Sequence, residues 1–271
     1  MQMTFRWYGD GNDDITPEMI RQIPGVSGLV WALHNKQPGE IWTVEEIEKV
    51  RTRIEGAGFH MDVVESVNVH DDIKIGLPTR DQYIENYKTT LKNLAKFGVK
   101  VVTYNFMPIF DWTRTDLFHP LEDGSNALYY EKSKIQDDYK EMAEYILKNL
   151  HGKTFPGWEP ERMAKLDELF EAYRPVTKEK LWENLQYFLE AIMPTCHETG
   201  IKMAIHQDDP PWDIFGIPRL LCDKESIGRF LHMVDDEYNC LCLCSGSLGA
   251  NMENNVADII RTYCDRIAFA H

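Results

Sequence analysis

Three residues with strong metal-binding side chains occupy equivalent positions in the sequence pattern, because each of them ends a short apolar segment. His206 ends KMAIH, Cys244 ends LCLC and His271 ends IAFAH. A single histidine at such a place is more often a hydrogen-bonded loop residue, but three residues in register indicate a metal site. Two imidazoles and a thiolate suit a divalent transition ion such as Mn²⁺, Fe²⁺, Co²⁺ or Zn²⁺. A mixed set of this kind favours a site that also takes a carboxylate and keeps positions open for substrate.

Polar residues at the ends of other apolar segments could bind a small polar substrate. Arg6, near the end of the first segment, is either a carboxylate clamp or a partner in an ion pair at the rim. Asp208 and Asp209 directly follow His206 and either orient a ligand histidine, hold a sugar hydroxyl, or form a solvated Asp-Pro turn. Glu65 is a weaker candidate. The predicted substrate-binding residues are Arg6, Trp7, Asn105, Asp208 and Asp209.

The elements that position these residues form a repeating pattern of apolar strands and amphipathic helices. This alternation is typical of β-α units on a parallel sheet. In a closed barrel of such units, the carboxyl ends of the strands meet at one mouth, where active sites of this fold lie. The sequence predicts seven strands at 3–8, 28–33, 60–66, 100–105, 201–206, 239–244 and 266–271, with helices at about 16–23, 43–57, 79–97, 177–199, 223–234 and 254–264.

The regular alternation lapses over a long insertion after the fourth strand, at about 107–175. The insertion is punctuated by Trp, Pro and Gly (FDWTR, FPGWEP), and one helix is predicted near 133–150. Insertions of this size are usually lids or binding loops. A (β/α)₈ TIM barrel needs an eighth unit, so we expect residues 1–271 to form a single α/β TIM-barrel domain with that unit missing. We therefore expect the chain to be the amino-terminal part of a longer protein that ends within the barrel.

Composition and charge exclude several classes of partner. The chain has 29 Lys and Arg against 44 Asp and Glu, a net charge of −15, which repels nucleic acid and anionic membrane surfaces. The 43% of hydrophobic residues supplies a core, yet no run of about 18 apolar residues and no secretory signal pattern is found. Four of the six cysteines crowd into residues 222–244, which indicates thiols rather than an extracellular disulfide framework. The sequence predicts a cytoplasmic protein.

Several motifs together resemble the mannonate dehydratase family, over essentially the whole chain. They are FRWYG at 5–9, RQIPGVSGLV at 21–30, YNFMPIFDWTRTDL at 104–117, FPGWEPER at 155–162, KMAIHQDDPPWDIFGIPR at 202–219 and CSGSLGA at 244–250. Gln207 departs from the family, which commonly has proline there, and this changes loop stiffness.

The resemblance implies a xylose-isomerase-like barrel that dehydrates D-mannonate to 2-dehydro-3-deoxy-D-gluconate in hexuronate catabolism, with Mn²⁺ or Fe²⁺ as cofactor. It implies that His206, Cys244 and His271 are three of four metal ligands. The fourth ligand, an aspartate, and the His and Tyr of proton transfer would lie in a family segment beyond His271. The catalytic acid and base therefore stay unassigned in this chain.

The predicted function is metal-dependent dehydration of D-mannonate. A base removes the C2 proton, an acid helps the C3 hydroxyl leave, and a divalent ion stabilises the developing enediolate. One alternative is a metal-dependent sugar isomerase or epimerase on the same barrel, and another is an inactive fragment. The predicted partner is a small-molecule sugar acid, with a homodimer left open and neither nucleic acid nor membrane expected.

Overall fold

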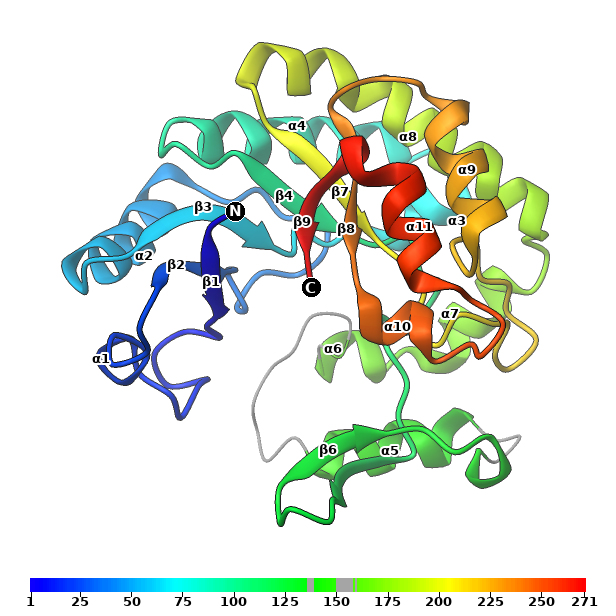
Figure 1. Cartoon of the computed structure of the whole chain (residues 1–271). Coiled ribbons are helices and arrows are strands. Elements are labelled where there is room, and N and C mark those ends of the chain that lie inside the picture. Colours follow the sequence, from blue (N-terminus) through cyan, green and yellow to red (C-terminus); the bar gives the residue numbers. More distant parts are fainter. Residues whose placement is uncertain (136–138, 150–157, 159) are drawn as a thin grey trace.

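Parallel strands form one curled sheet in the computed structural model, which describes residues 1–135, 139–149, 158 and 160–271. The sheet has seven strands in the order β1-β2-β3-β4-β7-β8-β9, and every neighbouring pair is parallel (Figure 1). The chain therefore has the α/β TIM-barrel type of fold predicted from the alternation. The strands are β1 (Met3–Arg6), β2 (Val26–Trp31), β3 (His60–Glu65), β4 (Val101–Tyr104), β7 (Lys202–His206), β8 (Asn239–Leu243) and β9 (Ile267–Ala270).

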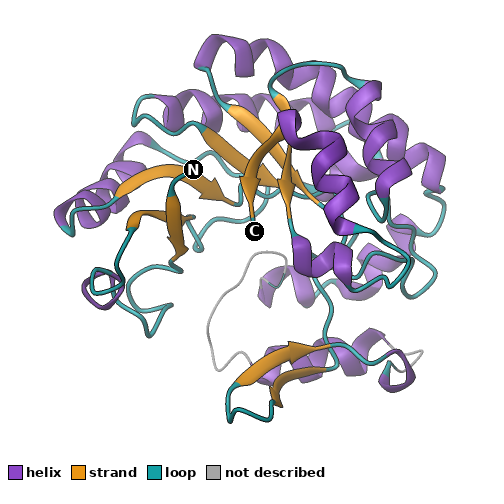
Figure 2. Ribbon diagram, in the orientation of Figure 1, coloured by secondary structure: helices purple, strands orange, loops and turns teal. Residues whose placement is uncertain are grey.

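Helices pack around the outside of the curled sheet (Figure 2). Because helices cover one face and the barrel interior lies on the other, the central strands are mostly apolar and buried, as in the fully buried NCLCL of β8. The helices of the β-α units are α1 (Pro17–Ile20), α2 (Val44–Gly56), α3 (Asp71–Ile75), α4 (Arg80–Ala95), α8 (Lys178–Thr199), α9 (Lys224–Met233), α10 (Ser245–Gly249) and α11 (Val256–Tyr263), followed by the 3₁₀ turn η2 (Cys264–Arg266).

Local capping signals set the helix boundaries. Thr43 and Glu46 form the predicted capping box at the start of α2, each side chain accepting the other's backbone N–H. Thr177 caps α8, which ends at Gly200 in a left-handed conformation (φ 72°). The short helices α3 and α10 were not predicted, since single turns of helix carry little periodicity.

The insertion lies beyond the carboxyl ends of the strands and has more structure than the sequence predicts (Figure 1). An antiparallel hairpin precedes the helices, and its turn contains Gly124 at φ 84°. The predicted helix at 133–150 is wrong in extent, because a 3₁₀ turn occupies its start and the described helix begins at Tyr139; residues 136–138 and 150 lie outside the described residues. The elements are β5 (Asp116–Pro120), β6 (Asn126–Tyr129), η1 (Lys132–Lys134), α5 (Tyr139–Asn149), α6 (Pro160–Met163) and α7 (Leu166–Tyr173).

Aromatic stacking joins the helices of the insertion to the loop that follows β4. Phe110 stacks on Trp158 with ring centroids 5.0 Å apart, and Tyr139 stacks on Phe170 at 3.6 Å. Phe110 also contacts Phe215 of the loop that follows β7, with ring centroids 6.1 Å apart, so the insertion packs against the carboxyl end of the sheet. Over the described ranges, no helix combines the length and the apolar character that crossing a lipid bilayer requires.

Candidate metal centre and substrate cavity

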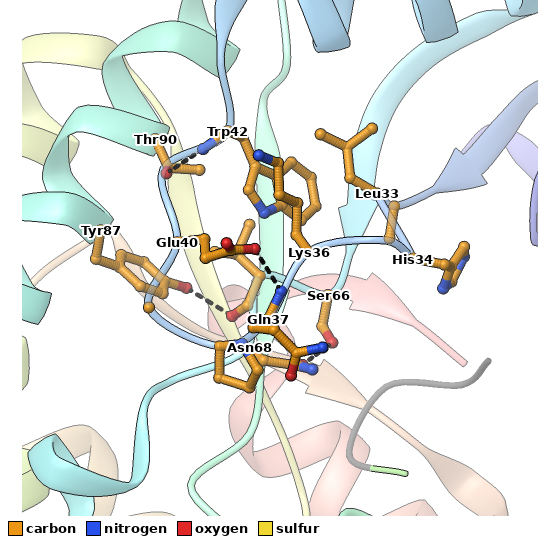
Figure 3. Close-up of a pocket in the computed structure, with 14 residues that line it drawn as sticks. Leu33, His34, Lys36, Gln37, Glu40, Trp42, Ser66, Asn68, Tyr87 and Thr90 are labelled. Atoms are coloured by element: carbon orange, nitrogen blue, oxygen red, sulfur yellow. Dashed lines mark hydrogen bonds between the residues drawn. The ribbon is translucent and has the colours of Figure 1, made fainter. Parts of the chain in front are cut away.

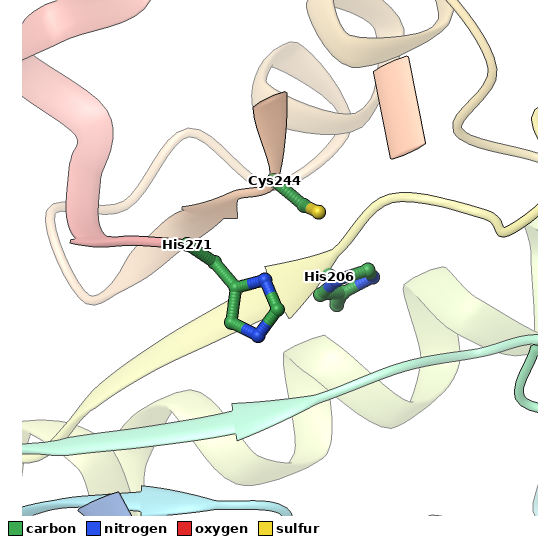
Figure 4. Close-up of side chains that lie close together, drawn as sticks. All are labelled: His206, Cys244 and His271. Atoms are coloured by element: carbon green, nitrogen blue, oxygen red, sulfur yellow. The ribbon is translucent and has the colours of Figure 1, made fainter. Parts of the chain in front are cut away.

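The three predicted metal-binding residues lie together at the ends of neighbouring strands. His206 ends β7, Cys244 follows β8 and His271 follows β9, so the sheet order places their side chains side by side. One ligand atom from each lies within 4.8 Å of the others, and the two imidazole rings are 5.4 Å apart at an angle of 84°. Figure 4 shows the Cys244 sulfur and both rings around one space. The structure brings together the residues that the strand ends predict.

Hydrogen bonds orient these side chains. His206 Nδ1 lies 2.6 Å from the carbonyl oxygen of Gln207, which can only accept, so Nδ1 carries a proton and Nε2 is the nitrogen left for a metal ion. The side-chain oxygen of Gln207 accepts the backbone N–H of Cys244 at 2.9 Å. The Cys244 sulfur caps α10 by accepting the N–H of Ser247 at 3.4 Å. On the other side, His271 Nε2 lies 3.4 Å from a Glu65 carboxylate oxygen.

The electrostatics favour a thiolate between the two imidazoles. Burial raises the pKa of Cys244, but hydrogen bonds with His206 and His271 outweigh burial and lower that pKa to about 5. Burial lowers the pKa of His206, yet its hydrogen bond with the Cys244 sulfur raises the pKa to about 9. The same sulfur raises the pKa of His271. A divalent cation would take the place of the imidazole protons and pair with the thiolate, so this donor set fits a metal ion.

A cavity of about 520 Å³ opens beside the three residues. This volume suits a small polar ligand such as a six-carbon sugar acid. The barrel wall is mainly polar, and the insertion supplies an apolar and aromatic wall opposite. Residues of the barrel wall include Arg6, Tyr8, Glu65, Ser66, Thr103, Asn105, His206, Asp209 and His271, and the insertion contributes Asp111, Trp112, Arg114, Leu117, Phe118 and Leu128.

Arg6, Asn105 and Asp209, three of the five predicted substrate-binding residues, line this cavity. Arg6 lies 3.6 Å from Glu65 and its guanidinium carbon sits 4.4 Å from the centroid of the Tyr8 ring. The Asn105 side-chain oxygen accepts the N–H of Met107 at 3.1 Å, which fixes its amide.

Trp7 and Asp208, the other two, lie away from the cavity. Successive side chains on a strand point to opposite faces, so Arg6 and Tyr8 face the barrel interior while Trp7 faces outward and is 3% exposed. Asp208 is buried as well, and one of its oxygens accepts the N–H groups of Leu220 and Leu221 at 3.1 and 2.7 Å. Neither Trp7 nor Asp208 lines this cavity, and their role in substrate binding stays a prediction.

Arg114 and Tyr8 line the cavity although the sequence assigned them no role. Arg114 grips Asp209 with two parallel hydrogen bonds of 2.6 and 2.7 Å. Arg114 lies in the insertion, where no strand pattern indicates the direction of a side chain. Tyr8 could have been found from strand alternation, because it shares a face with Arg6.

A separate cavity beside the loop that follows β2 does not compete for the substrate (Figure 3). Its volume of about 20 Å³ holds about one water molecule. The hydrogen bonds from Tyr87 to Val67 and from Trp42 to Thr90 belong to its wall and hold the loop in place.

Comparisons with known proteins show the family of this chain. The sequence model of the D-mannonate dehydratase family matches residues 1–271. A mannonate dehydratase of Shouchella clausii is 56% identical over 100% of this chain and 76% of its own length, and mannonate dehydratase 1 of Bacillus licheniformis is 59% identical over 100% and 74%. The crystal structure of mannonate dehydratase from Streptococcus suis serotype 2 is 42% identical, with a TM-score of 0.86 over 100% of this chain and 72% of that one. The chain belongs to the mannonate dehydratase family.

Proposed function

We propose that this protein removes water from D-mannonate to give 2-dehydro-3-deoxy-D-gluconate in hexuronate catabolism. The observation that carries the proposal is the group of His206, Cys244 and His271 beside a cavity of about 520 Å³, in a chain that belongs to the mannonate dehydratase family. The reaction needs a C2 proton to leave from the position next to the carboxylate and a hydroxyl to leave from C3.

His206, Cys244 and His271 would hold the metal ion, for which we propose Mn²⁺ or Fe²⁺. When bound, a divalent ion of this kind stabilises the negative charge that develops at the substrate carboxylate during loss of the C2 proton. The imidazole nitrogens donate lone pairs to such ions, and the negative charge of the thiolate offsets part of the positive charge of the ion.

Arg6, Asn105 and Asp209 would bind the substrate. The Arg6 guanidinium is a fork that matches a carboxylate, and it lies on the same wall as His206 and His271. The Asn105 amide and one remaining lone pair of Asp209 suit sugar hydroxyls. From the insertion, Trp112 and the buried Leu117 contribute apolar surface to the cavity and reduce the access of water.

Six free thiols support a reducing compartment, and we place the protein in the cytoplasm on that basis.

The hairpin of the insertion exposes Phe118, Leu121 and Leu128, and this apolar surface supports a homodimer as the assembled form. Light scattering of the purified protein measures the mass that tests the dimer.

The test of function is an assay of the full chain after chelation and reloading with Mn²⁺ or Fe²⁺. D-mannonate is expected to yield 2-dehydro-3-deoxy-D-gluconate, and the Cys244→Ala variant is expected to lose this activity. A ketose or an epimer formed without loss of water would instead establish the sugar isomerase or epimerase alternative. Absence of any product with either ion would refute the proposal.

A further inference from the structure

An ion pair links the insertion to the loop that carries the metal ligand His206. Arg114 comes from the insertion and Asp209 from the loop after β7, 95 residues later in the sequence. The two side chains are 18% and 13% exposed and meet through two hydrogen bonds of 2.6 and 2.7 Å. Planar, two-pronged contacts of this kind fix geometry as well as charge.

The same carboxylate reaches the metal site through one hydroxyl. Ser247 is 4% exposed, and its Oγ lies 3.2 Å from Asp209 Oδ2 and 3.2 Å from the Cys244 sulfur. A serine hydroxyl has one hydrogen, so Ser247 can donate to only one of these two acceptors at a time. Asp209 and Cys244 therefore compete for that hydrogen.

The Arg114 guanidinium favours the Cys244 sulfur over Asp209 as the acceptor of the Ser247 hydrogen. Its two N–H groups already supply both oxygens of Asp209 and offset the carboxylate charge, which weakens the demand of Asp209 for the Ser247 hydrogen. The hydroxyl is then available to the Cys244 sulfur. Without the guanidinium, a buried carboxylate would draw the hydroxyl to itself, because an unpaired buried charge is costly.

We propose that Arg114 is a positioning residue of the metal centre, acting through Asp209 and Ser247 on the Cys244 sulfur. The proposal rests on the metal site of the proposed function. Arg114 also lines the substrate cavity, so the insertion's wall and the metal centre are joined by one side chain. The position of the Cys244 sulfur as a metal ligand then depends on how the insertion packs against the barrel.

The test measures Co²⁺ binding by the metal-free full chain, with Co²⁺ alone as the probe. The variants are Arg114→Lys, Ser247→Ala and the double variant. Lysine keeps the charge but lacks the fork, and Ser247→Ala removes only the shared hydroxyl. The readouts are the Co²⁺ dissociation constant and the thiolate-to-Co²⁺ charge-transfer absorption. The control is Arg174→Lys in the same insertion, an arginine whose side chain is 73% exposed beside Glu171.

Each single variant is expected to bind Co²⁺ about 10- to 100-fold more weakly, the usual effect of losing a partner behind a metal ligand. The charge-transfer band is expected to shift or weaken in both. Because both residues act along one path, the double variant is expected to bind about as weakly as Ser247→Ala. The control should bind like wild type. Arg114→Gln, which keeps two amide hydrogens, replaces Arg114→Lys if that variant shows no cooperative thermal unfolding.

The outcomes separate the two proposals. A wild-type chain that binds no Co²⁺ overturns the metal site itself. A wild-type chain that binds Co²⁺, with Arg114→Lys unchanged in affinity and absorption, overturns the role of Arg114 alone. If the loss of Co²⁺ affinity in the double variant equals the product of the losses in Arg114→Lys and Ser247→Ala, the two residues act independently and the shared path is overturned.

Discussion

A buried ion pair anchors the insertion at a second place, between residues that do not line the substrate cavity. Asp71, at the start of α3 and 9% exposed, accepts two hydrogen bonds from Arg162 of α6 at 2.8 and 3.0 Å. The Tyr173 hydroxyl of α7 donates to the same carboxylate at 2.7 Å. The Lys74 ammonium, also buried, donates to the carbonyl of Met107 at 2.8 Å. One carboxylate thus holds α6 and α7 of the insertion to the barrel.

Asp71→Asn keeps the shape of this side chain and removes its charge. Arg162, whose side chain is 10% exposed, would then lose its charge-assisted hydrogen bonds to Asp71. Removing one partner of a buried ion pair costs about 3–5 kcal/mol. We expect that loss in the free energy of unfolding, measured by urea denaturation near neutral pH. The control is Glu183→Gln, which breaks the surface pair with Lys180 (side chains 59% and 50% exposed) and is expected to cost about 0–1 kcal/mol.

The pH dependence supplies a second readout. Burial raises the pKa of Asp71, but the charges of Arg162 and Lys74 outweigh burial and hold the pKa well below its ordinary value. A lowered folded-state pKa means that this stabilisation is complete above the unfolded pKa, about 3.9, and is lost as the pH falls toward the folded value. Below about pH 4, wild type should therefore lose stability more steeply than Asp71→Asn. A cost under about 1 kcal/mol at neutral pH, or equal acid sensitivity of the two proteins, would refute the reasoning.

Other variants test the assigned roles of single residues. Cys244→Ser replaces a soft thiolate by a hydroxyl and is expected to weaken Co²⁺ binding and abolish the charge-transfer band, as absorption titration would show. Arg6→Lys loses a two-pronged carboxylate contact of about 1.5–3 kcal/mol, so KM for D-mannonate should rise about tenfold or more in steady-state assays. Trp7→Phe should lower the thermal unfolding midpoint and leave KM unchanged, because Trp7 is buried on the outer face; a raised KM would restore it to the substrate site.

The barrel's repeating units and the metal ligands follow from local signals in the sequence. Thr43 and Glu46 specify the start of α2 through contacts three residues apart, and no tertiary structure is needed to form them. His206 and Cys244 end apolar segments, and parallel pairing of β7 with β8 brings strand ends together wherever they lie in the chain. The three side chains could therefore be predicted to lie together from the rule that parallel strands end at the same side of the sheet.

The features that the sequence did not predict depend on which face of a strand a side chain occupies or on contacts between residues far apart in the sequence. Trp7 and Arg6 are adjacent, and only the parity of the strand decides which of them faces the cavity. The strands of the hairpin, such as β6 (Asn126–Tyr129), are half-exposed and short, so their alternation is weak despite the turn sequence LEDGS between them. The contact of Arg114 with Asp209 spans 95 residues and exists only once the insertion has packed.

The two anchors of the insertion divide its roles. Asp71 and Arg162 meet among buried residues outside the cavity lining, where we expect their charges to act mainly on the free energy of unfolding. Arg114 and Asp209 meet at the cavity wall, one hydroxyl away from the Cys244 sulfur, where a change of geometry reaches the metal ligands. The insertion therefore completes the cavity by its packing and tunes the metal centre by a single arginine, so stability and metal affinity should respond to different residues.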